Sequence, residues 1–403
     1  MKPKPNDPPA DLQQQVDRAL AAGGLDQLGT RELLSVLLSC LFHAERRSHL
    51  EQTAGDKGNG TYDRMVNVGS LPVDVDVPRT RTGDFRPSQL PPPYQRGYGD
   101  AARDLLVQLV AASRSMGAAR QALHGMGLAI SDEAIDSVAR HFIEEFELRN
   151  TRPLDTELLA LFIDGKYVEV REGDRLRPSC VYLAVGLRRD GKKRVLACQV
   201  LPGRESPDGW KTLQRSLIER GLRNVLIVVQ DDFPGLLALT KGLFVQADVQ
   251  LCIVHAQRNA KTHLGKAGAA EFNSRLRTIK ACYDPELAAG QWEQLCQACE
   301  KDSPTFIAEL RKKREHYLAF LRYPEPVRRT FSTTNAVEAV NGQLEIMRRN
   351  NGGYFSSADN LKARLGIAIE RLENGRWSRL AAAISSALPQ LNAMFVTRFE
   401  SQS

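Results

Sequence analysis

Acidic side chains stand at the ends of two strongly apolar segments. Asp164 follows residues 159–163, and Asp231 follows residues 226–230. A carboxylate at the edge of a buried strand loses solvation, so two such acids on one sheet favour a shared cation. Phosphoryl transfer on DNA uses two divalent cations held by a few carboxylates. Either aspartate alone could instead cap a helix or a turn, and register alone does not choose between Asp231 and Asp232.

The segments around these acids alternate between strand and helix patterns. Three strands joined by hairpins, followed by helix, strand, helix and strand, make an α/β order with a mixed sheet. After them, residues 266–330 have an almost wholly helical pattern. Apolar periodicity predicts strands at 158–171, 181–187, 195–200, 225–229 and 249–254, and helices at 208–220, 236–244, 333–348, 357–372 and 380–395.

The first third of the chain has a different pattern. It predicts a helix at 29–52, a short hairpin at 62–77 and an extended basic linker rich in Pro and Arg at 78–97. Helical patterns then follow at 101–113, at 116–124 and from Ser131 onward. A short helix, a glycine turn and a further helix fit a helix-turn-helix DNA-binding unit, and a plain three-helix packing module fits equally well.

Composition sets wide bounds on the class of protein. The 403 residues are 42% hydrophobic and 26% charged, which is typical of globular protein and long enough for two or three domains. The net charge of +7 only weakly favours a polyanionic partner. We expect no membrane span and no secretory signal, because no long apolar run is present. The seven scattered cysteines then indicate reduced thiols in the cytoplasm.

Five segments, in chain order, resemble motifs of one protein family. The family is the mutator-type insertion-sequence transposases of bacteria, relatives of the eukaryotic mutator-like elements. The matching segments are Val77–Pro87, Arg152–Leu154 with Phe162–Val168, Val228–Leu236, Cys252–His255 with Arg258-Asn259, and Thr333–Asn341.

The resemblance implies a DDE transposase with a ribonuclease H-like mixed-sheet core. Its motif places a Gly-Leu pair four residues after the second aspartate, which selects Asp231 rather than Asp232. The third acid is then Glu338, beyond an all-helical insertion. Asp164, Asp231 and Glu338 would hold two Mg²⁺ ions, for which Mn²⁺ can substitute.

Further residues near these motifs are candidates for contact with DNA or the reacting groups. His255 would lie beside the carboxylates and contact the scissile phosphate or a catalytic water, whereas zinc binding with Cys252 lacks further ligands. Asn335 and Asn341 could bind phosphate or orient Glu338, or be ordinary polar positions on a helix. Trp292 is a candidate for stacking on a flipped base, with a core position as the alternative. The remaining DNA-binding candidates are Arg79, Arg81, Arg86, Arg258, Asn259, Arg348 and Arg349.

The implied function is transposition of the element's own DNA. The partners would be terminal inverted repeats and target double-stranded DNA, bound by a homodimer or larger assembly associated with the bacterial nucleoid. The route could be copy-out–paste-in. Two rivals are a catalytically silent, domesticated DNA-binding protein and a nuclease that cuts without joining. We divide the chain into a helical region at 1–53, a hairpin and basic linker at 54–98, a helix-turn-helix-like domain at 99–150, core segments at 151–265 and 331–403, and the insertion at 266–330.

Overall fold

A computed structural model describes residues 30–53, 55–68, 71–88, 90, 107–113, 115–125 and 132–400. The chain divides into two compact units, Met1–Val138 and Ala139–Ser403, which are described separately. Within the described residues, no single helix is long and apolar enough to cross a membrane. Only the bent pair Ala358–Ser378 and Ala382–Phe399 passes on length and composition.

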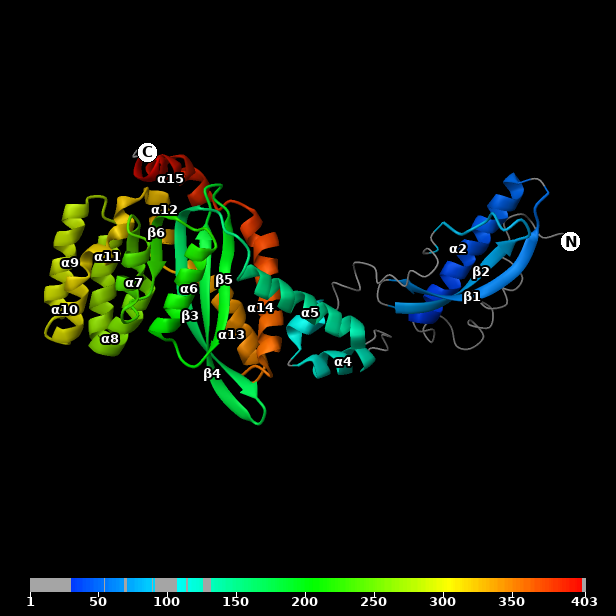
Figure 1. The fold of residues 1–403 in the computed structure, drawn as a ribbon, viewed down its shortest axis with the longest axis horizontal. Helices are drawn as coiled ribbons and strands as arrows, with labels where there is room; N and C mark the ends of the chain where they lie inside the picture. The colour runs from blue at the N-terminus through cyan, green and yellow to red at the C-terminus, as the bar shows by residue number, and fades with distance from the viewer. Residues whose placement is uncertain are drawn as a thin grey trace. The chain divides into compact units, whose positions relative to one another are not determined.

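The first unit contains the predicted helix and hairpin. Helix α2 (Thr30–Gln52) packs on an antiparallel pair of strands, β1 (Gly58–Val68) and β2 (Leu71–Thr80) (Figure 1). Every second residue of β2 from Val73 to Val77 is buried against the helix residue Phe42, so strand alternation forms this small core.

The prediction of an extended linker at 78–97 is wrong for the first residues of that range. Strand β2 continues to Thr80, and Pro78 pairs with Thr61 on β1. A two-stranded sheet consists only of edge strands, which tolerate a proline that has no N–H to donate. The backbone N–H of Arg81 still donates to the Lys57 carbonyl at 2.8 Å, so the pairing reaches past the proline.

The helices after the linker are only partly described. Residues 107–112 are helical, and the rest of the helix predicted at 101–113 lies outside the described residues. Helices α4 (Met116–Gly125) and α5 (Asp132–Arg149) occur where the sequence predicts them. Arg120 joins the two helices by donating to both carboxylate oxygens of Asp136, at 2.6 and 2.7 Å. The turn between the helices lies outside the described residues, so the helix-turn-helix stays a prediction.

The second unit is built on a five-stranded mixed sheet. The strand order is β5-β4-β3-β6-β7, with the β3–β4 and β4–β5 pairs antiparallel and the β3–β6 and β6–β7 pairs parallel. This confirms the α/β class and the mixed sheet. The strands are β3 (Glu157–Glu172), β4 (Arg175–Leu187), β5 (Lys193–Pro202), β6 (Asn224–Gln230) and β7 (Asp248–Leu251).

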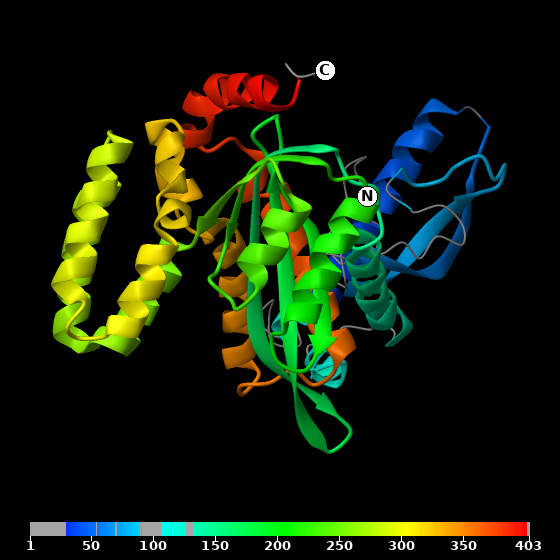
Figure 2. The same cartoon turned by 60° about the vertical axis from the view of Figure 1, so that its left-hand side comes forward.

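Helices cover both faces of this sheet (Figure 2). Helices α6 (Pro207–Glu219) and α7 (Leu236–Leu243) pack on one face, where Trp210 and Leu213 of α6 meet the β3 residue Ile163. The other face is covered by the last turns of α5 and by α13 (Asn335–Asn350), α14 (Ala358–Asn374) and α15 (Ala382–Phe399).

A helical segment separates the last strand from α13, as the resemblance implies. The strand predicted at 249–254 ends at Leu251, and a helix begins at Ile253. The backbone N–H of Ile253 donates to the Ser332 carbonyl at 2.9 Å, a contact across 79 residues that ends the sheet ladder there. The elements are α8 (Ile253–Lys280), broken at Gly265 where φ is 69°, α9 (Pro285–Cys299), α10 (Pro304–Lys312), α11 (Arg314–Tyr317), η2 (Ala319–Arg322) and α12 (Glu325–Phe331).

After α13 the chain returns to the sheet. Phe355 forms two backbone hydrogen bonds with β3, donating to the Glu169 carbonyl at 2.8 Å and accepting from the Arg171 N–H at 2.9 Å. Its ring is fully buried. The end of the α13 segment is therefore fixed to the distal half of the longest strand. The 3-10 helix η3 (Arg376–Ser378) then joins α14 to α15.

Candidate functional site

The two aspartates lie at one level on neighbouring strands, although Asp164 stands in the middle of the long β3 and not at its end. Asp164 belongs to β3, and Asp231 directly follows β6. The parallel register pairs Phe162 with Val229, so each aspartate comes two residues after a paired position. Two carboxylates therefore meet at the same edge of the sheet, as the sequence predicts.

Asp164 is the buried member of this pair. Only 6% of it is exposed. One carboxylate oxygen accepts from the Gly165 N–H at 3.0 Å, and the other accepts from Asn341 Nδ2 at 2.9 Å. Burial raises the pKa of Asp164 to about 7; His255 opposes this rise, and the charges of Asp231 and Glu205 add to it. These carboxylates repel one another in a buried position. A divalent cation would relieve that repulsion, and oxygen atoms are the ligands that it prefers.

Asp231 and Asp232 have different partners. Lys313 Nζ donates to both carboxylate oxygens of Asp232 at 2.9 Å, and the Tyr317 hydroxyl donates to one of them at 3.3 Å. Asp231 instead accepts from the Asp232 N–H at 2.6 Å and faces His255 Nδ1 at 3.7 Å. Asp232 thus anchors the helical segment, and Asp231 remains available beside Asp164.

This difference predicts opposite effects for two adjacent substitutions. Asp231→Asn should abolish the DNA strand cleavage that the family resemblance implies, because it removes a charge beside Asp164. Asp232→Asn should keep most of the activity and lower the free energy of unfolding by about 1 kcal/mol, since Lys313 loses a charged acceptor. Cleavage assays and urea unfolding of both variants measure these effects. A fully active Asp231→Asn variant would contradict the assignment.

Helix α13 carries the third acid over the edge of the sheet. Asn341 makes the hydrogen bond to Asp164, and Glu338 lies one turn earlier on the same helix. The Glu338 side chain is 32% exposed and accepts from Arg258 Nη2 at 3.3 Å. Asn335, the first residue of α13, is exposed. Of the two asparagines that sequence analysis singled out, Asn341 is the one that contacts an aspartate of the pair.

We expect Asn341 to position Asp164 rather than to react itself. Asn341→Ala should lower the kcat of strand cleavage by about 10- to 100-fold with little change in DNA affinity, as typical for residues that orient a metal ligand. Asn341→Asp should be worse, because it adds a like charge next to Asp164. Gln343→Ala, at an exposed position of the same helix, is the matched control. Equal kcat for Asn341→Ala and the control would show that this hydrogen bond does not position the acid.

The start of helix α8 adds two more polar groups to this edge. Cys252 is the N-cap, so His255 lies in the first turn of α8, not at a strand end as the sequence predicted. Arg258, one turn further, has Nη1 at 3.2 Å from His255 Nε2 and donates through Nη2 to Glu338. A chain of polar contacts therefore runs from Asp231 through His255 and Arg258 to Glu338.

The contacts of His255 constrain its protonation. Burial lowers its pKa, while Cys252 and Asp231 raise it, with a net rise to about 9. Arg258 can only donate, however, so its contact with Nε2 requires a neutral ring that carries the proton on Nδ1. We favour the neutral ring while Arg258 is in contact, because a protonated ring would direct an N–H at the guanidinium.

Cys252 is a packed thiol at the same helix start. Its sulfur lies 3.5 Å from the Thr334 hydroxyl and accepts from the Thr334 N–H at 3.4 Å. The thiol is 1% exposed. Burial raises its pKa, but the hydrogen bonds with His255 and Thr334 outweigh burial and lower it overall.

A fourth acid at this edge was missed by sequence reasoning. Glu205, between β5 and α6, accepts from Trp210 Nε1 at 2.8 Å. A Cβ on Gly165 would lie 3.1 Å from the Glu205 carboxyl carbon, so the glycine next to Asp164 leaves room for this acid. Burial raises the pKa of Glu205, Trp210 opposes this rise, and the charge of Asp231 adds to it. No local sequence pattern marks it, because tertiary packing alone brings it here.

The four acids are close without forming a finished metal site. Among the residues that the structure describes, no three His, Cys, Asp or Glu side chains stand close enough, as placed, to hold one ion. Glu338 is held by Arg258 instead of turning toward Asp164. The carboxylates at this edge are the oxygen donors that a divalent cation suits.

Trp292 does not occupy the position that base stacking requires. It is fully buried in α9, and its ring stacks on Tyr317 with centroids 5.3 Å apart and planes at 21°. The burial of Trp292 supports the core alternative, and its role in DNA binding stays a prediction.

The basic candidates divide between the two units. Arg258 and Asn259 are exposed on α8. On α13, Arg348 and Arg349 both pair with Glu345, at 2.7 and 3.0 Å. The other three candidates belong to the first unit and are exposed there: Arg79, whose guanidinium lies 4.3 Å from the Tyr62 ring centroid, Arg81 and Arg86.

The chain belongs to the Mutator family of transposases, whose family model matches residues 11–374. A probable transposase of an insertion sequence element from Sinorhizobium fredii is 27% identical over 385 residues, covering 91% of this chain and 92% of the relative. The IS905 transposase of Lactococcus lactis is 25% identical over 315 residues, covering 78% and 79%. A Drosophila P element transposase complex matches with 13% identity over 74% of this chain and 81% of that chain, at a TM-score of 0.27 that is too low to indicate a shared fold.

Proposed function

We propose that this protein moves its own insertion sequence by binding the terminal inverted repeats and catalysing metal-dependent strand cleavage and strand transfer. The family and the relatives' names support transposition. The mixed sheet with acids at one edge supports a ribonuclease H-like core, interrupted by the helical segment from α8 to α12.

One observation carries this proposal. The Asn341 side chain on α13 hydrogen-bonds Asp164 on β3, across 177 residues of sequence. That contact brings the Glu338 helix to the edge where Asp164 and Asp231 meet. Two aspartates on neighbouring strands, with a glutamate on the helix that contacts one of them, support the acid set that the family resemblance implies.

The residues of this edge have separate roles in the proposed chemistry. Asp164, Asp231 and Glu338 would hold two Mg²⁺ ions, with Mn²⁺ as a substitute. Such ions, when bound, neutralise the charge on the reacting phosphoryl oxygens and lower the pKa of a nucleophilic water or hydroxyl. Asn341 orients Asp164, and Arg258 and His255 offer N–H donors to phosphate oxygens once Arg258 leaves Glu338.

The same chemistry would serve two successive reactions. Water first attacks the phosphodiester at the end of the element, and the bond to the 3′-oxygen breaks, which leaves a 3′-hydroxyl. That hydroxyl then attacks a target phosphodiester, so one bond forms as another breaks. Because both ends must be joined, the working form is a homodimer or larger assembly on DNA. The family resemblance alone supports a copy-out–paste-in route, and a cut-and-paste route would use the same two reactions. The α4–α5 region and the arginines of the first unit would recognise the ends.

The direct test incubates the full-length protein with labelled duplexes carrying the ends of its own element, with Mg²⁺, Mn²⁺ or EDTA. We expect cleavage at the element end and joined products in either metal, and neither product in EDTA. Cleavage without joining would replace the proposal with the nuclease alternative. Binding without any cleavage would favour a silent DNA-binding protein.

A further inference from the structure

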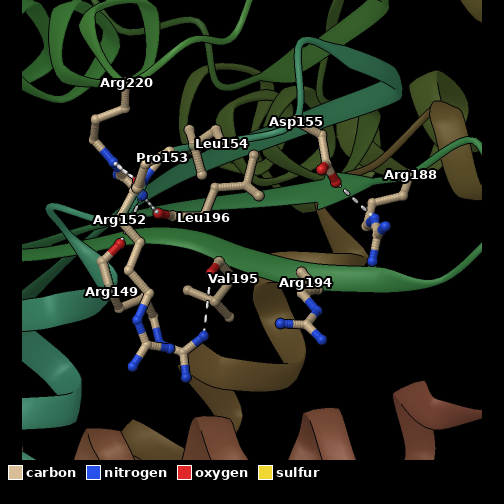
Figure 3. A pocket seen from close by; sticks show the side chains of 10 residues that line it. All are labelled: Arg149, Arg152, Pro153, Leu154, Asp155, Arg188, Arg194, Val195, Leu196 and Arg220. Atoms are coloured by element: carbon tan, nitrogen blue, oxygen red, sulfur yellow. Dashed lines mark hydrogen bonds and ion pairs between the residues drawn. The ribbon is translucent and has the colours of Figure 1, made fainter.

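A cavity of about 240 Å³ opens where the edge strand β5 begins (Figure 3). Its walls come from the end of α5, the loop entering β3, the start of β5 and the C-cap of α6. By strand register, Arg194 faces Gly186 whereas Asp164 faces Leu183, so the cavity is separate from the carboxylate edge. Five arginines line it: Arg149, Arg152, Arg188, Arg194 and Arg220.

Two of these five guanidinium groups have no acidic partner among the described residues. Arg194 and Arg220 are those two, and the cavity therefore carries uncompensated positive charge. The other three are paired: Arg149 with Glu373 at 2.9 Å, Arg152 with Glu145 at 2.8 Å and Arg188 with Asp155 at 2.8 Å.

Arg220 is held rigidly and still has a donor unused. Its Nε and Nη2 donate to the carbonyls of Arg152, Arg149 and Leu196 at 2.7, 2.7 and 2.9 Å. Its Nη1 and the Nε of Arg149 are both buried without a hydrogen-bond partner in the described structure. Burial lowers the pKa of Arg220, and no acid opposes this effect. A buried donor of this kind has lost its hydrogen bonds to water, and an acceptor that enters the cavity would replace them.

Arg194 is an exposed member of the cavity lining. Its side chain is exposed and makes no contact in Figure 3, where it lies between the Arg149 and Arg188 sides. An anion entering here would meet fixed donors on one wall and a flexible guanidinium on the other.

We propose that this cavity binds a phosphodiester group of the DNA backbone. The inference rests on the proposed function in taking DNA as the ligand. Phosphate accepts several hydrogen bonds at once, and guanidinium groups match that geometry. The contact positions DNA without reading its sequence, because backbone phosphates are alike in every sequence.

The test measures how a short fluorescein-labelled DNA duplex binds the full-length protein without divalent cations, by anisotropy over a range of salt. Arg194 is the residue to change, because its side chain forms no hydrogen bond or ion pair with the part of the chain that the structure describes. Arg194→Ala should weaken binding about 5-fold and lower the slope of log affinity against log salt by about 1. Arg194→Glu should weaken binding further, and Arg194→Lys should stay near wild type. Arg215→Ala, at an exposed position of α6 outside the cavity, is the matched control.

Two results would overturn the inference. One is wild-type affinity and salt slope for both Arg194→Ala and Arg194→Glu. The other combines two measurements at constant ionic strength. If inorganic phosphate stabilises the wild-type protein but not Arg194→Ala, and the variant still binds DNA with wild-type affinity, the cavity binds free phosphate and not DNA. If the protein neither cuts nor joins DNA but the Arg194 variants lose affinity as expected, the proposed function fails and this inference stands.

Discussion

Asp164→Asn is expected to lower strand cleavage and joining by about 10³-fold or more while DNA affinity stays at the wild-type level. The substitution keeps the planar shape and one of the two acceptor oxygens, but removes the charge that a cation needs. The oxygen can still accept from the Gly165 N–H, and Asn341 must turn its amide so that its oxygen accepts from the new N–H. Since Asp164 is 6% exposed, the change does not alter any surface that DNA could bind. Cleavage assays and anisotropy on one protein preparation measure both quantities.

Thermal unfolding gives the same substitution a second readout. Without divalent cations, Asp164→Asn should melt at a higher temperature than wild type, because it relieves repulsion among Asp164, Asp231 and Glu205. Added Mg²⁺ should stabilise wild type and have much less effect on the variant, as linkage requires for a ligand bound to the folded state. Asp232→Asn is the control and should respond to Mg²⁺ as wild type does. Equal stabilisation of wild type and Asp164→Asn would show that Asp164 does not hold the ion.

Trp292→Ala should lower the free energy of unfolding by about 4 kcal/mol, the typical cost of deleting a buried aromatic ring. Trp292 is fully buried and stacks on Tyr317, whose hydroxyl reaches Asp232. Its loss therefore opens a cavity beneath the contact that joins the helical segment to the sheet. Trp292→Phe should recover much of the stability, because it refills most of the volume.

Urea unfolding and DNA binding together separate packing from base stacking. Tyr283→Ala is the control, because this ring is 73% exposed, and its removal should change stability by less than about 0.5 kcal/mol. A Trp292→Ala protein that is as stable as wild type but binds DNA more weakly would restore the stacking hypothesis. A destabilised protein whose remaining folded fraction binds DNA normally would support the core position.

The strands of the core and their acidic ends could be predicted from local pattern. The apolar run that ends in Asp231 marks the end of β6, whereas the run that ends in Asp164 marks only the first half of β3, which continues with the buried residues Val168 and Val170. The choice between Asp231 and Asp232 required the family resemblance, because the physical reason lies 81 residues away, where Lys313 pairs with Asp232. Glu205 escaped notice for a similar reason, since its nearness depends on the missing side chain of Gly165.

Tertiary contacts also explain where sequence predictions of elements failed. The apolar run at 249–254 continues as a strand pattern, yet the chain turns into α8 at Ile253, whose N–H is bonded to Ser332. Trp292 shows a second limit of prediction from local sequence. An aromatic residue in a helical pattern has the same local signal whether it is buried or exposed.

The long stretch of chain between β3 and α13 has a consequence for biosynthesis. A ribosome releases Asp164 and Asp231 well before α13, and Asn341 reaches Asp164 only across 177 residues of chain. Contacts of such long sequence separation form late in folding. A nascent or truncated chain that ends before α13 therefore holds two of the three acids without Glu338, and we expect it to leave DNA uncut. Under the proposed function, a requirement for α13 would therefore protect the encoding genome from breakage by incomplete chains.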